Sequence, residues 1–192
     1  MVSVPNEGGV ERSLLSWLDG VGWETHGKDG GRGAEVLDER YDRRSNEVIY
    51  WNLLAEQVIE LNDEITEKNV EKFVSSLRRD LDHGNLMDGN HEFHEILTKG
   101  KKFSVQNDDG STENIYVDII DFENPTNNRF HAVNQFSVSR GTTIRPDVNL
   151  FVNGIPLVSL ELKSVTQAND YYDAISDLRT YEDDGPRAFV PG

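Results

Sequence analysis

The chain has no cysteine among its 192 residues. Disulfides and thiolate metal sites are therefore excluded, and any metal ion must be held by carboxylate, imidazole or carbonyl groups. This favours a hard ion such as magnesium. Long apolar runs are also absent, since no stretch approaches the roughly 18 residues that span a membrane, and the N-terminus lacks the basic and apolar regions of a signal peptide. We therefore expect a cytoplasmic protein with no membrane partner.

Basic residues are scarce in this sequence. The 19 Lys and Arg residues stand against 35 Asp and Glu residues, which gives a net charge of −16. Such a surface repels nucleic acid at ordinary salt concentration. The acids are spread over many segments, such as 108–110 and 182–184, and this pattern favours a halophilic source, whose salt screens the repulsion. The other interpretation, a partner that is not nucleic acid, stays open.

Helical periodicity dominates the first half of the chain. Hydrophobic residues make up 36% of the sequence, and the length fits one domain over residues 1–192, with a helical part at about 10–100. A polar, Gly-rich stretch at 26–35 predicts a surface loop. The predicted helices cover 10–19, 46–61, about 67–80, about 89–98 and, near the C-terminus, 169–181.

The apolar period changes to two after residue 115, which is typical of strands. We expect the sheet, and with it the candidate active site, within about 115–181. The sheet and the helices together predict an α/β fold. The predicted strands cover 115–122, 130–138, 146–152 and 156–163.

The last two predicted strands carry ionisable residues at neighbouring ends. Asp147 stands at the start of one strand, and Glu161 and Lys163 stand at the end of the next. The Asn153-Gly154 pair between the strands predicts an antiparallel hairpin. Such a hairpin brings the three side chains to the same end of the sheet.

The apolar residues of this hairpin predict its register. The apolar residues of the two strands lie on one face of the hairpin only if the loop has an odd number of residues or a strand carries a bulge. This follows because side chains alternate between the two faces along a strand. We therefore expect a three-residue loop at 153–155 and exclude a tight two-residue turn. Asp147 then lies opposite Glu161, with Lys163 on the same face. The opposite, apolar face contains Val148, Leu150, Leu160 and Leu162.

Two adjacent carboxylates repel each other unless a cation neutralises them. Asp147 and Glu161 are therefore candidate ligands of Mg²⁺, with Mn²⁺ as the alternative ion. Such an ion polarises a phosphate and activates water, while Lys163 neutralises charge in the transition state. The opposing interpretation is a salt bridge between Asp147 and Lys163 with Glu161 in solvent, and a motif this short does not decide between the two.

Longer segments carry a family resemblance. The segment RPDVNLFVNGIPLVSLELK at 145–163 resembles the nuclease hairpin of the restriction subunit of type I restriction-modification enzymes, within the PD-(D/E)XK superfamily. The segments at 119–138 and 90–100 are similar to the strand-turn-strand and the helix that precede this hairpin in the family. They occur in the family order, so the resemblance extends over nearly the whole chain.

The resemblance implies a PD-(D/E)XK endonuclease-like fold, in which helices flank a mixed central sheet. It implies magnesium-dependent cleavage of double-stranded DNA, with Asp147, Glu161 and Lys163 as catalytic residues and the first two as metal ligands. Restriction subunits of this family continue into ATP-driven translocase domains and assemble with modification and specificity subunits. The chain is then an N-terminal fragment of a larger subunit, and ATP binds only to domains outside it.

Several further residues are candidates for the site. Many related nucleases carry Gln-x-x-x-Tyr on the helix after the hairpin, and the matching positions here are Asp177 and Tyr181, so the Gln is missing. Tyr181 and Arg145 are candidate DNA contacts, and Glu11 is a candidate third carboxylate. The HEFHE segment at 91–95 is a competing metal motif, although its order differs from those of known zinc motifs.

Two other functions stay open. The missing Gln and the net charge of −16 favour a nuclease-like module that only binds or scaffolds. A stand-alone repair or defence nuclease is the third hypothesis. Magnesium binding distinguishes a competent nuclease from the scaffold, and the length of the full gene tests the stand-alone form.

Overall fold

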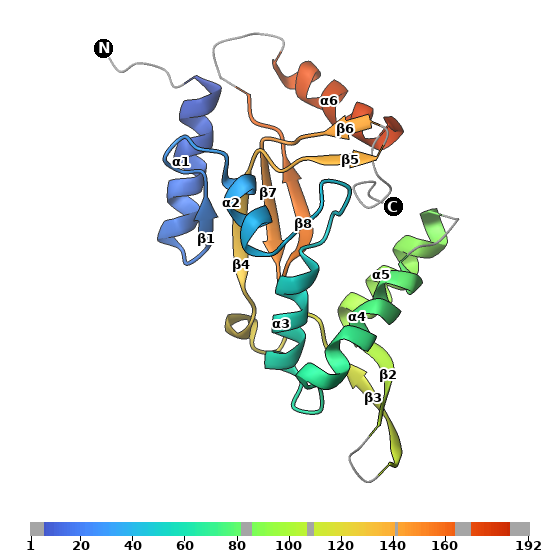
Figure 1. Ribbon diagram of the computed structural model, residues 1–192. Helices are drawn as coiled ribbons and strands as arrows, with labels where there is room; N and C mark the ends of the chain where they lie inside the picture. The colour runs from blue at the N-terminus through green and yellow to red at the C-terminus, as the bar shows by residue number, and fades with distance from the viewer. Residues whose placement is uncertain (1–5, 82–85, 107–109, 141, 164–169, 185–192) are drawn as a thin grey trace. The chain divides into compact units, whose positions relative to one another are not determined.

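The computed structural model describes residues 6–81, 86–106, 110–140, 142–163 and 170–184. The chain forms two compact units, shown in Figure 1. The sheet unit consists of residues 1–50 and 129–191, and the helical unit consists of residues 51–128. No helix within the described ranges is long and apolar enough to cross a membrane.

The sheet unit contains a four-stranded sheet with helices beside it. The strand order is β1-β4-β7-β8, in which β1 is parallel to β4 and the other pairs are antiparallel. The α/β class with a mixed sheet is therefore confirmed. The elements are α1 (Glu7–Gly20), β1 (Glu24–His26), α2 (Gly33–Arg40), β4 (Phe130–Asn134), β5 (Val138–Arg140), β6 (Thr142–Ile144), β7 (Val148–Val152), β8 (Ile155–Leu160) and α6 (Asp170–Asp184).

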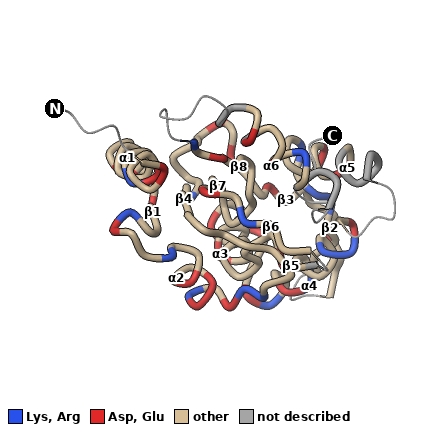
Figure 2. The backbone as a smooth tube through the Cα atoms, turned by 90° about the horizontal axis from the view of Figure 1, so that it is seen from above, with Lys and Arg blue, Asp and Glu red and all other residues tan. Residues whose placement is uncertain are grey.

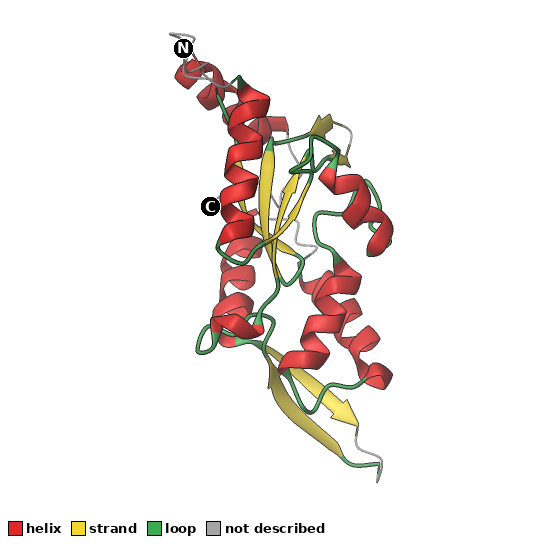
Figure 3. Cartoon of the chain, turned by 90° about the vertical axis from the view of Figure 1, so that its left-hand side faces the viewer, coloured by secondary structure: helices red, strands yellow, loops and turns green. Residues whose placement is uncertain are grey.

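Helix α1 covers the apolar face of the sheet. The helix starts at Asn6, whose side-chain oxygen accepts a hydrogen bond from Gly9 N at 3.0 Å, so its first turn is capped. Leu15 and Leu18 are buried against strands β4 and β7, and α1 lies alongside the strands in Figure 3. The predicted helix over 10–19 is confirmed. The residues packed in this layer are Leu14, Trp23, Ala132, Val148, Leu150, Leu160 and Leu162.

Aromatic residues fill the opposite face of the sheet. Tyr50, Phe136 and Phe151 are fully buried, and their ring centroids lie 4.9–5.8 Å apart at steep angles. Such tilted pairs avoid the repulsion of stacked ring faces. The sheet is therefore buried on both faces around β4 and β7, which fixes the directions in which their side chains point.

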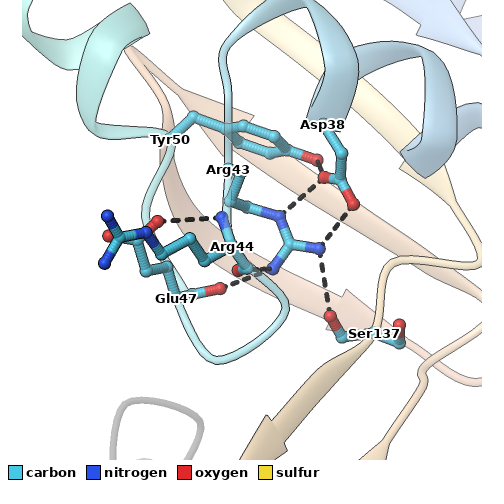
Figure 4. A network of polar contacts seen from close by, with 6 residues as sticks. All are labelled: Asp38, Arg43, Arg44, Glu47, Tyr50 and Ser137. Carbon is cyan, nitrogen blue, oxygen red and sulfur yellow. Dashed lines mark hydrogen bonds and ion pairs between the residues drawn. The ribbon is translucent and has the colours of Figure 1, made fainter.

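A buried arginine organises the loop between α2 and Tyr50 (Figure 4). The Arg43 guanidinium donates to both oxygens of Asp38, at 2.6 and 2.7 Å, and to the backbone oxygens of Glu47 and Ser137. Its charged group also lies 4.3 Å from the Phe136 ring centroid. The Arg43 side chain is only 1% exposed, so this network replaces water at every side of the guanidinium.

The helical unit contains three helices and a hairpin. Helix α4 starts after Thr66, whose backbone N–H donates to Asn69 Oδ1 at 2.9 Å, and the predicted helix over 67–80 is confirmed. Phe73 of α4 packs edge-on against Phe103 of the hairpin. The elements are α3 (Trp51–Leu61), α4 (Glu67–Asp80), α5 (Leu86–Lys99), β2 (Lys101–Gln106), β3 (Thr112–Val117) and the 3₁₀ turn η1 (Pro125–Asn127).

Some element boundaries differ from the sequence prediction. The predicted helix over 46–61 begins only at Trp51, because the Tyr50 N–H donates to Gly154 O and the preceding residues line the sheet unit. The predicted loop at 26–35 ends early, where α2 begins at Gly33. The predicted strand over 130–138 is interrupted at Gln135, whose φ is +56°.

The predicted strand over 115–122 is also wrong in extent and partner. It ends at Val117 and pairs only with β2, in a two-stranded antiparallel sheet within the helical unit. The sequence analysis did not predict β2. Lys101 and Lys102, at its start, break the apolar alternation on which strand prediction depends.

We expect substitution of Arg43 by Met to lower the free energy of unfolding by about 3 kcal/mol, because it leaves Asp38 without its buried partner. Lys28→Met is the matched control, since Lys28 and Asp19 form an ion pair in which both side chains are about half exposed. Its loss should cost less than about 1 kcal/mol. Urea unfolding followed by circular dichroism measures both, and equal effects would contradict the central role of Arg43.

Candidate active site

The hairpin of β7 and β8 closes through a tight turn. Asn153 and Gly154 both have positive φ, +52° and +83°, and Val152 pairs directly with Ile155. This is the primed turn that Asn-Gly sequences favour. The exclusion of a two-residue turn was therefore wrong.

A bulge in β8 provides the extra residue that the apolar pattern requires. Phe151 pairs with Pro156, whereas Leu150 pairs with Val158, so Leu157 has no residue opposite it. Beyond the bulge the register continues to Val148 opposite Leu160. The expected pairing of the apolar faces is confirmed, and the bulge achieves it in place of a longer loop.

Three backbone contacts hold the turn in place. Asn153 is fully buried, its N–H donates to Arg129 O at 2.9 Å, and its Oδ1 accepts from Arg129 N at 2.8 Å. Gly154 O accepts from Tyr50 N at 2.9 Å. Because the turn cannot slide, the pairing at the far end of the hairpin is fixed as well.

Asp147 stands directly before β7 and Glu161 directly after β8. One further step of the observed register places them opposite each other. The Asp147 carboxylate accepts a hydrogen bond from Leu162 N at 2.7 Å, and the Asp147 carbonyl accepts one from Gln135 N at 3.1 Å. Both acids are half-buried. The Asp147 carboxylate is thus held at this end of the sheet by a backbone hydrogen bond.

Lys163 forms its ion pair with Asp177 of α6, with Nζ 2.9 Å from Oδ2. This hydrogen bond raises the pKa of the lysine, against the opposing effect of burial, and the charges of Asp177, Glu161 and Glu7 add to the increase. Asp177 stands at the position where the resemblance described above implies a Gln. In this chain that position contributes an acid that holds the ammonium group of Lys163.

Glu11 of α1 is held at the same end of the sheet. Its Oε1 accepts a hydrogen bond from Asn134 Nδ2 at 2.8 Å, and Asn134 is paired with Val148, the neighbour of Asp147. Asn134 Oδ1 also accepts from Gly33 N at 2.6 Å, which fixes the amide. Glu11 is therefore fixed at the end of β4 that pairs with the start of β7.

The remaining candidates are Arg145, Tyr181 and the two histidines of α5. Arg145 is exposed, next to the buried Pro146. The side chain of Tyr181 lies outside the described residues. His91 and His94 are exposed on α5, where Glu95 is paired with Lys99, and no metal-like cluster forms around them within the described part of the chain.

Acidic and basic positions are interspersed along the described backbone (Figure 2). Both ends of helix α2 show this pattern, where Arg32, directly before the helix, pairs with Glu35 and Arg40 pairs with Glu24 of β1. The net charge of −16 is therefore distributed over the chain, as its sequence predicts.

A second group of metal-ligand residues was missed by the sequence analysis. Glu24, His26 and His131 lie together on β1 and β4. His26 and His131 are 105 positions apart, and only the pairing of β1 with β4 brings them into contact. No short motif contains this group.

Comparison with known proteins identifies a family. The family described as type I restriction enzyme R protein N terminus matches residues 5–192. The type I restriction enzyme HindI endonuclease subunit of Haemophilus influenzae is 34% identical over 191 residues, which are 96% of this chain and 17% of that protein. A type I restriction enzyme endonuclease subunit of Staphylococcus aureus is 31% identical over 96 residues, which are 50% of this chain and 10% of that protein. The chain thus spans about a sixth of the HindI subunit.

We expect Asp177→Asn to lower the pKa of Lys163 towards the ordinary lysine value, because Asp177 provides the largest stabilisation of the protonated form. The measurement is a side-chain NMR titration of Lys163. Asp173→Asn, an exposed acid on the same helix, is the control and should leave the titration unchanged. An unaltered Lys163 pKa in Asp177→Asn would show that the ion pair is absent in solution.

Proposed function

Because the chain belongs to the family of type I restriction enzyme R protein N-terminal regions, we propose that it is a metal-dependent endonuclease that hydrolyses phosphodiester bonds of double-stranded DNA. The observation that carries the proposal is the register of the β7–β8 hairpin. Its last pair, Val148 with Leu160, brings Asp147 and Glu161 to the same end of the sheet, and Lys163 follows two residues after Glu161.

The donor groups at this end fit a hard divalent ion. Asp147 and Glu161 offer carboxylate oxygens from adjacent strands, and Glu11 brings a third carboxylate to the same end of the sheet. Mg²⁺ prefers oxygen ligands and uses one or two carboxylates, with Mn²⁺ as the alternative. We assign Asp147 and Glu161 as the ligands. When bound, such an ion polarises the phosphate and lowers the pKa of a water molecule.

Lys163 acts as the cation of the site. Its amine is protonated at neutral pH, as that of an ordinary lysine is, and the hydrogen bond to Asp177 and the negative charge of Glu161 raise its pKa further. A positive group beside the scissile phosphate stabilises the charge that develops as water attacks. Asp177 orients the ammonium group through its hydrogen bond. It is a positioning residue in this scheme.

The proposal includes partners beyond this chain. Arg145 and Tyr181 contact the DNA, and modification and specificity subunits assemble with the full-length restriction subunit in the cytoplasm. ATP binds to translocase domains outside these residues. The net charge of −16 makes DNA binding by the chain alone weak, so the assembled complex holds the DNA. A salt-rich, halophilic cell interior reduces that repulsion further.

One observation favours a second candidate, a nuclease-like module that binds or scaffolds without cutting. Asp177 is an acid at the position where the family resemblance implies a Gln. Its carboxylate forms an ion pair with Lys163, the lysine of the motif. A carboxylate at that position repels the DNA phosphates. The two candidates differ in whether the hairpin carboxylates bind a catalytic ion.

We expect Asp147→Asn, Glu161→Gln and Lys163→Ala each to reduce DNA cleavage by the assembled restriction complex at least about a hundredfold, as removal of one group that stabilises the transition state does. ATP hydrolysis by the same complexes should persist. Glu113→Gln, an exposed acid on β3, is the control and should cleave normally. Full cleavage by Asp147→Asn would refute the assignment.

We also expect the 192-residue chain to bind Mn²⁺ in calorimetric titrations, and binding should be lost in the double variant Asp147→Asn, Glu161→Gln. Mn²⁺ is used because it generally binds protein ligands more tightly than Mg²⁺. Glu113→Gln again serves as the control. Absence of carboxylate-dependent binding in the wild-type chain would favour the scaffold function.

A further inference from the structure

Two histidines and a glutamate meet at the β1 edge of the sheet. Glu24 and His26 belong to β1, and His131 lies opposite Glu24 in the parallel pairing of β1 with β4. His26 Nε2 is 3.2 Å from His131 Nδ1. Glu24 Oε1 is 3.5 Å from His26 Nε2, and Glu24 Oε2 is 3.8 Å from His131 Nδ1. The three groups therefore converge on one point.

These distances are close to those between the ligand atoms around a bound metal ion. A tetrahedral zinc ion has bonds of about 2.0–2.1 Å to imidazole nitrogen, which place its ligand atoms about 3.4 Å apart. One potential ligand atom from each of the three residues lies within 4.8 Å of the other two. Small side-chain adjustments thus bring all three onto a single ion.

We propose that Glu24, His26 and His131 form a binding site for a borderline divalent transition metal, with Zn²⁺ as the preferred ion. The ligands are His26 Nε2, His131 Nδ1 and the Glu24 carboxylate. Two imidazoles and one carboxylate are a donor set that suits Zn²⁺ and not Mg²⁺, which takes oxygen ligands. The exposed Glu24 lies on the solvent side of the cluster, where a water molecule completes the shell.

Burial disfavours the charged form of both histidines. It lowers the pKa of His131, which is fully buried, to about 4. It also lowers the pKa of His26.

Arg40 competes with a metal ion at this site. Its Nη1 donates to Glu24 Oε1 at 2.9 Å, and its side chain is about half exposed. The guanidinium occupies a ligand atom and also repels a cation. Removal of Arg40 should therefore strengthen metal binding, an effect that an ordinary surface ion pair between Arg40 and Glu24 does not predict.

A metal at this position clamps β1 onto β4. Strand β1 is a short edge strand, whose pairing with β4 covers only three residue pairs. The same β4 carries Asn134, which holds Glu11 and Gly33. We therefore assign the ion a structural role, in which it stabilises the edge of the sheet that supports the hairpin site.

The test is titration of the 192-residue chain with Zn²⁺, in a background that carries Asp147→Asn and Glu161→Gln so that hairpin carboxylates do not contribute. We expect saturable binding of one ion, together with a rise in melting temperature. His26→Gln and Glu24→Gln should each weaken binding at least about tenfold, because even groups that only orient metal ligands contribute that much. Arg40→Gln should bind Zn²⁺ more tightly.

His91→Gln is the matched control, since His91 is exposed on α5 and outside the cluster. It should leave the Zn²⁺ affinity unchanged. Co²⁺ should give the visible absorption of a tetrahedral complex that His26→Gln abolishes. The proposal is overturned if Zn²⁺ does not bind, if His26→Gln and His91→Gln bind it equally well, or if Arg40→Gln binds it no more tightly. None of these outcomes depends on DNA cleavage.

Discussion

The architecture of the sheet unit depends on one buried turn. Asn153 and Gly154 are fixed by hydrogen bonds to Arg129 and Tyr50, the two residues at which the chain passes between the sheet unit and the helical unit. The turn therefore closes the β7–β8 hairpin and also fixes Tyr50 and Arg129 within the sheet unit. Positive φ at both turn residues restricts the sequence there, since most side chains are strained in that conformation.

The position of the candidate active site follows from that turn. The two-residue turn alone would pair odd with even residues and direct Asp147 and Glu161 to opposite faces. The bulge at Leu157 restores the even pairing, so the register directs both carboxylates to the same face. Lys163 then lies within reach of α6, and its ion pair with Asp177 adds a charge that the hairpin does not provide.

Patterns that are local in sequence predicted the fold best. The α4 helix was readable from Thr66 and its apolar stripe, and the hairpin register was readable from alternating apolar residues. The sequence did not distinguish a longer loop from a bulge, because both satisfy the same alternation of apolar residues. The pairing of β1 with β4 was also unreadable, since three residues carry no periodicity and the partner lies 105 positions away.

The two metal sites that we propose lie at opposite edges of one sheet and differ in the chemistry of their ligands. The carboxylates of the hairpin lie at the β7–β8 edge, whereas the imidazoles lie at the β1–β4 edge. Carboxylate ligands generally bind Zn²⁺ more tightly than Mg²⁺. A carboxylate site therefore holds Mg²⁺ only where the concentration of Mg²⁺ is far above that of Zn²⁺. At the proposed β1–β4 site the imidazole nitrogens suit Zn²⁺ better than the carboxylates of the hairpin do. The oxygen donors of the proposed hairpin site suit a hard ion instead, which is the ion that our proposal places beside Lys163.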